Sequence, residues 1–168
     1  MVDAYVALGS NLGARHRALE DALRQLATLG DVVAQSKVYE TEPMGGPLGQ
    51  PWYLNMVVRI RTPLSAGALL NELLGIEVAQ GRTRTVKNGP RTLDLDLLLW
   101  DDLQTDDPHL SLPHPRMHHR RFVLEPLAEV HPCPKSIVGL DFYRSLAEVK
   151  EQHIRCLGEL GRWPDVVR

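Results

Sequence analysis

Two aspartates, Asp94 and Asp96, alternate with leucines inside an otherwise apolar run from Gly89 to Trp100. Residues two apart on a β-strand share one face, so both carboxylates are expected to point the same way. The leucines expected on the opposite face are Leu95, Leu97 and Leu99. Paired carboxylates on a buried strand are costly unless a cation neutralises them, and Mg²⁺ takes oxygen ligands from one or two carboxylates. The pair predicts a magnesium site that also holds substrate phosphates; a solvated edge of a half-exposed strand is the alternative.

A basic segment directly precedes this strand and carries Arg82, Arg84, Lys87 and Arg91. Guanidinium groups stay charged and bind phosphate oxygens with paired hydrogen bonds. Taken alone, the segment is equally compatible with an ordinary solvated loop. Its place between a helix end and the aspartates favours phosphate binding.

The glycine-rich turn from Gly9 to Gly13 follows a strand and precedes a helix, which suggests a second phosphate site. The turn lacks both the lysine of a Walker A loop and a GxGxxG pattern. A structural turn with Ser10 or Asn11 capping the helix is therefore favoured. The seven histidines show no zinc-binding spacing.

Tyr53 and Asn55 are two apart on a predicted strand and therefore face the same way. An aromatic ring beside an amide is suited to holding a flat heterocycle, by stacking and by paired donor and acceptor bonds. Cross-strand packing of the tyrosine and a turn bond from the asparagine are the alternative, which is favoured when these two residues are taken alone.

The elements that must position these side chains follow clear apolar periodicities. Strands are predicted at 2–8, 32–39, 53–61 and through the aspartate run, and helices at 14–29 and 65–80, with Ser65 as N-cap and Gly30 and Gly81 as stops. The β-α-β-β-α-β order, with the second and third strands antiparallel neighbours, predicts a ferredoxin-like α+β fold with a largely antiparallel sheet and a C-terminal helical extension. In that extension, residues 110–112 are expected to form a short strand and residues 142–160 a helix.

Composition limits the class of protein. A length of 168 residues and a hydrophobic content of 43% predict a single domain over 1–168. The net charge of −2 gives no support for a nucleic-acid or membrane partner. No apolar run of about 18 residues occurs in this sequence, we expect no signal peptide, and we interpret Cys133 and Cys156 as free thiols. We expect a cytoplasmic monomer.

Six short motifs follow one another along the chain: Ala7–Gly13, Tyr39–Pro43, Gln50–Asn55, Gln80–Arg84, Lys87–Leu98 and Leu112–Arg116. Together they resemble the motifs of the 6-hydroxymethyl-7,8-dihydropterin pyrophosphokinase family, in the family's order. The resemblance extends over roughly residues 4–130, and the last forty residues match only loosely.

The resemblance implies roles for individual residues. Asp94 and Asp96 would hold two Mg²⁺ ions on ATP, and Arg82 and Arg91 would contact the phosphates and assist transfer. The rest of the nucleotide site would comprise Leu69, Leu70, Glu77, Arg84, Leu97 through its backbone, Ser111, His114 and Arg120. The pterin pocket would comprise Thr41, Glu42, Met44, Tyr53, Asn55, Asp94 and Phe122, with the pterin ring between Tyr53 and Phe122.

The chain departs from the family pattern at four positions. Many members have tryptophan where Asn88 stands, and some have glutamine at Leu74, arginine at His109 or tyrosine at Pro115. These differences bear on single ATP contacts and leave the implied activity intact.

The implied reaction transfers a pyrophosphoryl group from ATP to the pterin's hydroxymethyl oxygen, releases AMP and serves tetrahydrofolate biosynthesis. Attack falls on the β-phosphorus, and Asp94 is a candidate acceptor for the hydroxyl proton. An RNA-binding module on a ferredoxin-like sheet is disfavoured by the near-neutral charge and the lack of an aromatic RNA-binding motif. A magnesium-dependent phosphohydrolase or nucleotidyltransferase would share the aspartates but not the Tyr53, Asn55 and Phe122 pocket.

Overall fold

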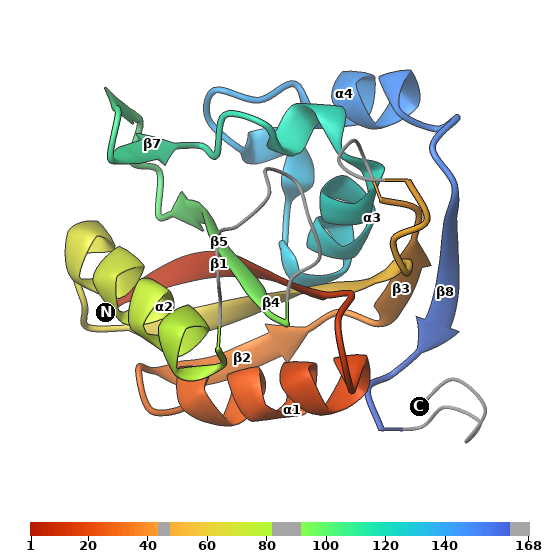
Figure 1. The fold of residues 1–168 in the computed structure, drawn as a ribbon. Coiled ribbons are helices and arrows are strands. Elements are labelled where there is room, and N and C mark those ends of the chain that lie inside the picture. Colours follow the sequence, from red (N-terminus) through yellow and green to blue (C-terminus); the bar gives the residue numbers. More distant parts are fainter. Residues whose placement is uncertain (44–47, 82–91, 162–168) are drawn as a thin grey trace.

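The computed structural model describes residues 1–43, 48–81 and 92–161. Its main sheet is fully antiparallel and has the strand order β5-β1-β4-β3-β8, with β2 paired beside β3 along β4 (Figure 1). Its strands are β1 (Val2–Ser10), β2 (Asp31–Gln35), β3 (Val38–Thr41), β4 (Tyr53–Thr62), β5 (Asp94–Trp100) and β8 (Ile154–Gly158). A separate hairpin pairs β6 (Thr105–Asp107) with β7 (Leu110–Leu112), where a short strand was predicted.

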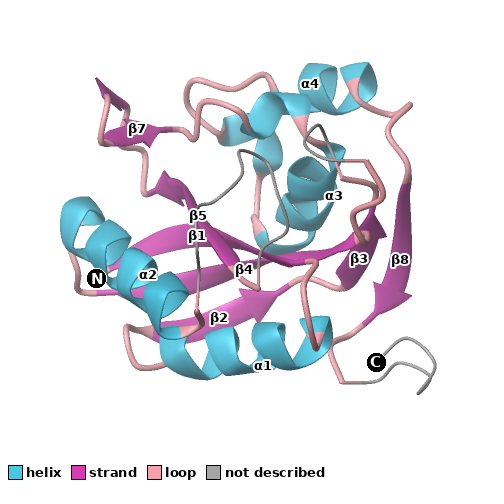
Figure 2. Cartoon of the chain, viewed as in Figure 1, coloured by secondary structure: helices cyan, strands magenta, loops and turns pink. Residues whose placement is uncertain are grey.

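Helices cover both faces of the main sheet (Figure 2). Helices α1 (Arg15–Leu26) and α2 (Ala66–Ala79) pack on one face, and α3 (Arg121–Val130) and α4 (Phe142–Glu148) on the other; short 3₁₀ turns span Met117–His119 and Pro134–Ser136. The order of β1 to β5 with α1 and α2 on one face confirms the ferredoxin-like α+β prediction. No described helix is long and apolar enough to cross a bilayer.

The apolar side chains on both faces of β4 explain why it can be the central strand. Leu54, Met56, Val58 and Ile60 enter the core beneath α1 and α2. Val57 points to the second core, beneath α3 and α4, and Tyr53 and Asn55 face that same side. A strand with both faces covered needs apolar residues at both parities, and β4 has them over its middle.

The predicted strand 32–39 is two strands. Ser36, which is 2% exposed, separates β2 from β3: its N–H donates to the Val57 carbonyl at 2.9 Å, and its hydroxyl accepts the Val57 N–H at 2.9 Å. The hydroxyl also donates to the Lys37 carbonyl at 2.7 Å. Because this side chain replaces part of the strand ladder, the chain bends and two strands share one side of β4.

Gly30 does not end the first helix, contrary to the prediction. Helix α1 ends at Leu26, and a Cβ on Gly30 would lie 2.4 Å from the Arg61 carbonyl oxygen. The glycine therefore allows the chain entering β2 to approach β4 closely. The second helix fits its prediction better, because the Ser65 hydroxyl accepts the Ala68 N–H at 3.2 Å as an N-cap.

The helix predicted from Phe142 to Leu160 is confirmed only over its first part. Helix α4 ends at Glu148, and Ile154–Gly158 forms β8 on the outer edge of β3. That edge leaves backbone groups unpaired, and pairing with them outweighs the local helical pattern. Cys133 and Cys156, the latter in β8, are free, as predicted.

Helix α3 was not predicted, and Pro126 inside it is a signal against a helix. The helix forms because one side of it is buried against the sheet. Its buried residues are Val123, Leu124, Pro126, Leu127 and Val130.

A bulge in β5 corrects the expected direction of Leu99. The pairing of β5 with β1 shifts register so that Val6 lies opposite Leu97 and Tyr5 opposite Leu99. Leu95 and Leu97 face the α1–α2 core as predicted, but Leu99 joins Leu98 in the α3–α4 core. Bulges turn successive side chains toward one face, which strict alternation cannot anticipate.

Candidate active site

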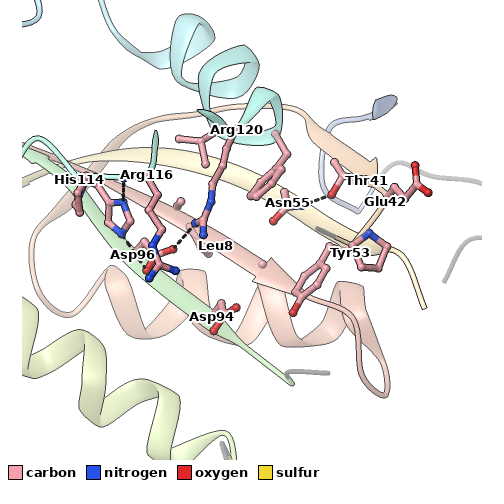
Figure 3. A pocket seen from close by; sticks show the side chains of 16 residues that line it. Leu8, Thr41, Glu42, Tyr53, Asn55, Asp94, Asp96, His114, Arg116 and Arg120 are labelled. Carbon is pink, nitrogen blue, oxygen red and sulfur yellow. Dashed lines mark hydrogen bonds and ion pairs between the residues drawn. The ribbon is translucent and has the colours of Figure 1, made fainter. Parts of the chain in front are cut away.

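One cavity of about 350 Å³ opens on the α3 side of the sheet, above β1, β4 and β5 (Figure 3). The predicted residues that line it are Thr41, Glu42, Tyr53, Asn55, Asp94, Asp96, His114, Arg120 and Phe122. The structure thus brings the aspartate pair and most of the predicted heterocycle pocket into a single space of the size that small-molecule sites have.

Strand register sets the two aspartates at different places in this cavity. Gly9 of β1 lies opposite Asp94 on one side and opposite Asn55 on the other. Asp96, two residues further along β5, lies opposite Ala7. Strands lie about 4.8 Å apart, so Asp94 and Asn55 stand about 10 Å apart across a residue without a side chain. The row thus places a carboxylate and an amide on either side of a glycine.

The aspartate end of the cavity gathers opposite charges around Asp96. Its carboxylate lies 3.7 Å from the His114 Nε2 and 3.8 Å from an Arg120 guanidinium nitrogen. The backbone N–H of His114 donates to the Leu98 carbonyl at 2.9 Å, at the bulge of β5. The bulge therefore helps to place the imidazole beside Asp96.

The protonation of His114 follows from its surroundings. Burial lowers the pKa of His114, and the nearby Arg120 and Arg116 lower the pKa further, while Asp96 opposes them. The Nδ1 atom accepts the Arg116 N–H at 3.2 Å, which requires an unprotonated nitrogen there. His114 therefore offers Nε2–H toward Asp96 as a neutral donor.

The other end of the cavity is held by hydrogen bonds. The Asn55 Nδ2 donates to the Thr41 hydroxyl at 2.6 Å, and Asn55 is 7% exposed. A Cβ on Gly9 would lie 2.7 Å from the Asn55 Oδ1, so the amide lies directly over the glycine backbone. On the far wall, the Arg120 guanidinium carbon lies 5.6 Å from the centre of the Phe122 ring. Amide, hydroxyl and aromatic groups are thus fixed around one space.

The turn from Gly9 to Gly13 serves this end of the cavity. The Asn11 Nδ2 donates to the Gln50 side chain at 3.0 Å and to the Pro51 carbonyl at 3.1 Å. The predicted cap is wrong, because α1 has Ala14 as N-cap, without a side-chain bond. Arg15 adds a bond to the Trp52 carbonyl at 2.7 Å. The turn and helix start therefore anchor the chain that leads into Tyr53.

Five predicted nucleotide residues do not line the cavity: Leu69, Leu70, Glu77, Leu97 and Ser111. Leu69 and Leu97 are buried in the α1–α2 core. Glu77 is 2% exposed and accepts the Leu95 N–H at 2.9 Å. Leu95 stands between the two aspartates, so Glu77 supports the aspartate strand from its outer edge.

Several predictions lie outside the described residues. They concern Met44, Arg82, Arg84, Lys87, Asn88 and Arg91. Within the described ranges, no group of three or more His, Cys, Asp or Glu side chains is arranged to hold a metal ion. The aspartate pair fits Mg²⁺ in a different way, because that ion takes one or two carboxylates and completes its shell with phosphate and water.

Seven lining residues were not assigned roles from the sequence, and two of them, Arg116 and Gly9, bear directly on the site. Arg116 adds a cation at the aspartate end, and Gly9 supplies the floor between the two ends. Both stand inside motifs already singled out, so proximity in sequence was the available signal. What the sequence lacks is the register that places Gly9 between Asp94 and Asn55.

Comparison with known proteins gives the family. The family model for 7,8-dihydro-6-hydroxymethylpterin-pyrophosphokinase (HPPK) matches residues 5–132. The 2-amino-4-hydroxy-6-hydroxymethyldihydropteridine pyrophosphokinase of Haemophilus influenzae is 44% identical over 132 residues, 77% of this chain and 82% of that protein. The protein of the same name from Bacillus subtilis is 47% identical over 130 residues, 76% of this chain and 77% of that protein.

Solved structures agree on the fold. A Plasmodium falciparum HPPK-DHPS crystal structure matches with a TM-score of 0.64 at 15% identity, over 88% of this chain and 43% of that one. At that identity the likeness concerns the fold alone, and this chain spans less than half of that protein. From the family model and the close relatives, the chain belongs to the 7,8-dihydro-6-hydroxymethylpterin-pyrophosphokinase family.

Proposed function

We propose that this cavity is where the chain transfers a pyrophosphoryl group from ATP to the hydroxymethyl oxygen of 6-hydroxymethyl-7,8-dihydropterin, releasing AMP. As a member of its family, the chain is an ATP-dependent pyrophosphokinase of folate biosynthesis. One observation supports this location above all: the aspartate pair and the heterocycle residues line a single cavity.

The pterin occupies the amide end. Its ring lies between Tyr53 and Phe122, and the Asn55 amide and the Thr41 hydroxyl meet its polar edge. Glu42 and Met44 complete the pocket in this proposal. A pterin held at Asn55 directs its hydroxymethyl arm toward Asp94, because Asn55, Gly9 and Asp94 form one row across the sheet.

ATP phosphates occupy the aspartate end. Asp94 and Asp96 would hold two Mg²⁺ ions, which, when bound, would neutralise phosphate charge and make the β-phosphorus more electrophilic. Arg120, Arg116 and His114 line this end and offer N–H donors to phosphate oxygens. Arg82, Arg84 and Arg91 add phosphate contacts, and Leu69, Leu70, Glu77, Leu97 and Ser111 border the rest of the nucleotide.

The chemistry rests on positioning and charge. Phosphoryl-type transfer has little covalent work for the protein, so rate comes from aligning the attacking oxygen with the β-phosphorus. Asp94 is the aspartate in the row of Asn55, so its carboxylate is placed to accept the proton of the pterin hydroxyl. Asp96, beside Arg120 and His114, stays on the phosphate side.

Two other classes fit less well. An RNA-binding module would use an open sheet face, whereas helices cover both faces of this sheet in the described part of the chain. A general magnesium phosphohydrolase or nucleotidyltransferase has no use for the buried Asn55–Thr41 pair beside Tyr53. We further propose that the chain acts as a cytoplasmic monomer with one domain over 1–168.

The test supplies ATP, Mg²⁺ and 6-hydroxymethyl-7,8-dihydropterin and follows nucleotide products by chromatography. AMP release that requires the pterin, and that is lost in Asp96→Ala, is the expected result. Release of ADP, or release of AMP without the pterin, contradicts the proposal and favours a hydrolase. Omitting Mg²⁺ in the presence of a chelator tests the metal requirement separately, since the wild type should then release no AMP.

A further inference from the structure

The segment that precedes β8 lies beyond the residues matched by the family model, yet it contacts both walls of the pterin end. The family match ends at residue 132. Strand β8 pairs with β3 so that Ile154 lies opposite Thr41. Two residues earlier, Gln152 reaches the start of α3. The segment thus joins the strand that carries Thr41 to the helix that carries Phe122.

Gln152 makes two side-chain bonds that bracket Arg120. Its Oε1 accepts the Arg121 backbone N–H at 2.9 Å, and its Nε2 donates to the His119 carbonyl at 2.7 Å. Arg121 also bonds to this segment through its side chain. Its guanidinium donates to the backbone carbonyls of Lys150 and Gln152 at 3.0 Å each. Four hydrogen bonds therefore fix the entry to α3.

The start of α3 needs such a partner. The first N–H groups of a helix have no acceptor within the helix, and a side chain at the N-cap position usually supplies one. Here the N-cap is Arg120, which makes no capping bond. The side-chain Oε1 of Gln152, 31 residues away in sequence, accepts the Arg121 N–H in its place.

The residues that follow this anchor face the cavity. Arg120 lies 3.8 Å from Asp96, and Phe122, in the first turn of α3, forms the wall opposite Tyr53 in the proposed pterin pocket. Behind Phe122 is a hollow of about 140 Å³, also lined by Gln152 and Ile154. A first turn released from its anchor has room to let the Phe122 ring retreat into that hollow.

We propose that Gln152 is a positioning residue for pterin binding: it caps α3 through the Arg121 N–H and so holds Phe122 against the pterin. This role rests on the proposed function of the cavity. Gln152 does not line the main cavity and touches no substrate in the proposed arrangement. Its loss therefore alters pterin affinity through Phe122.

The test compares Gln152→Leu, which removes both bonds at similar size, with Gln152→Glu, which keeps an acceptor for the Arg121 N–H. Lys150→Ala is the matched control, because this exposed residue meets Arg121 only through its carbonyl. Binding of 6-hydroxymethyl-7,8-dihydropterin is titrated against protein loaded with Mg²⁺ and α,β-methylene-ATP. Affinity for the ATP analogue is measured separately, without pterin.

Gln152→Leu is expected to weaken pterin binding about fivefold, which is the usual stability cost of a lost helix cap expressed as a change in affinity. The ATP analogue should bind to this variant as it binds to the wild type. Gln152→Glu should lose less pterin affinity than Gln152→Leu, since it keeps an acceptor for the Arg121 N–H although it loses the donor to the His119 carbonyl. Unchanged pterin binding by Gln152→Leu overturns the proposal. So does an equal loss of pterin and analogue binding, which indicates general damage.

Hydrogen exchange of residues 119–122, measured without ligands, separates this inference from the proposed function. Faster exchange of this segment in Gln152→Leu, with Lys150→Ala unchanged, is expected. Unchanged exchange refutes the anchor, whatever the ligand. If the wild type itself bound no pterin, the proposed function would fail, and so would the positioning role that rests on it. The exchange data would still decide separately whether Gln152 anchors the start of α3.

Discussion

The two ends of the cavity are built in different ways. At the pterin end, Asn55 is 7% exposed and its amide is bonded to Thr41 at 2.6 Å. At the phosphate end, the Asp96 side chain is 41% exposed, and its two cationic or polar neighbours stand 3.7 and 3.8 Å away, beyond hydrogen-bonding distance. The side chains of the pterin end are fixed by direct hydrogen bonds. At the phosphate end, the polar and charged side chains lie near Asp96 without direct hydrogen bonds to it.

This difference reflects what each ligand brings. A neutral heterocycle offers shape and a pattern of donors and acceptors, so its site must be preorganised, and buried polar groups must be paired beforehand. Phosphates and Mg²⁺ bring charges of their own, and in the proposed arrangement those charges would complete the network around the aspartates. Changes at the pterin end should therefore affect one substrate, and changes at the phosphate end should affect the reaction itself.

The largest expected effect is at the phosphate end. Asp96→Ala should lower kcat by about 10³-fold or more, because it removes a proposed metal ligand from the centre of charge stabilisation. Pterin-dependent AMP release measures it, with Asp102→Ala, an exposed aspartate just beyond β5, as control. A variant that keeps kcat but loses pterin affinity would reverse our assignment of the two ends.

Asn55→Ala should give the next largest effect, and on one substrate. Pterin affinity should fall about 10- to 100-fold, since a buried amide that bonds the ligand is lost and the Thr41 hydroxyl loses its partner. Equilibrium titration with pterin, beside titration with α,β-methylene-ATP, measures the split. If ATP affinity fell and pterin affinity held, the amide would belong to the nucleotide.

Gly9→Ala tests the row between the two ends. The added Cβ would lie 2.7 Å from the Asn55 Oδ1, so the amide must shift, and we expect about tenfold weaker pterin binding. Gly75→Ala on α2, where nothing lies within 4 Å, is the matched control and should raise stability by up to about 1 kcal/mol. Wild-type pterin affinity in Gly9→Ala would show that pterin binding does not depend on the position of the Asn55 amide over Gly9.

Much of this arrangement was readable from the sequence, and the reasons are specific. The alternation in β4 and the aspartate pair of β5 depend on strand period alone, and both are confirmed. The capping hydroxyl of Ser65 depends on local sequence and is also confirmed. These features need no knowledge of distant residues.

The features that were not readable depend on distant partners. The bulge that turns Leu99 is fixed by the register with β1, and the break at Ser36 by its bonds to Val57. Strand β8 exists because β3 offers an open edge, and Gln152 finds Arg121 from 31 residues away. Local propensity carries no information about such contacts.

The smallest effect we predict is a pH dependence at the phosphate end, where His114 stands as a neutral donor. Burial, helped by Arg120 and Arg116 and opposed by Asp96, lowers its pKa in the folded protein below the unfolded value of about 6.5. The unfolded chain then binds more protons in this range, so stability is complete above that value and declines as the pH falls through it.

His114→Asn should therefore flatten the decline in unfolding free energy between about pH 7 and pH 5. Urea unfolding at a series of pH values measures this, with His131, whose pKa burial also lowers, remaining as background in both proteins. Equal slopes in wild type and variant would mean that His114 is not held neutral. Its Nε2–H would then not be the fixed donor beside Asp96, and the phosphate end would carry a different net charge before substrate binds.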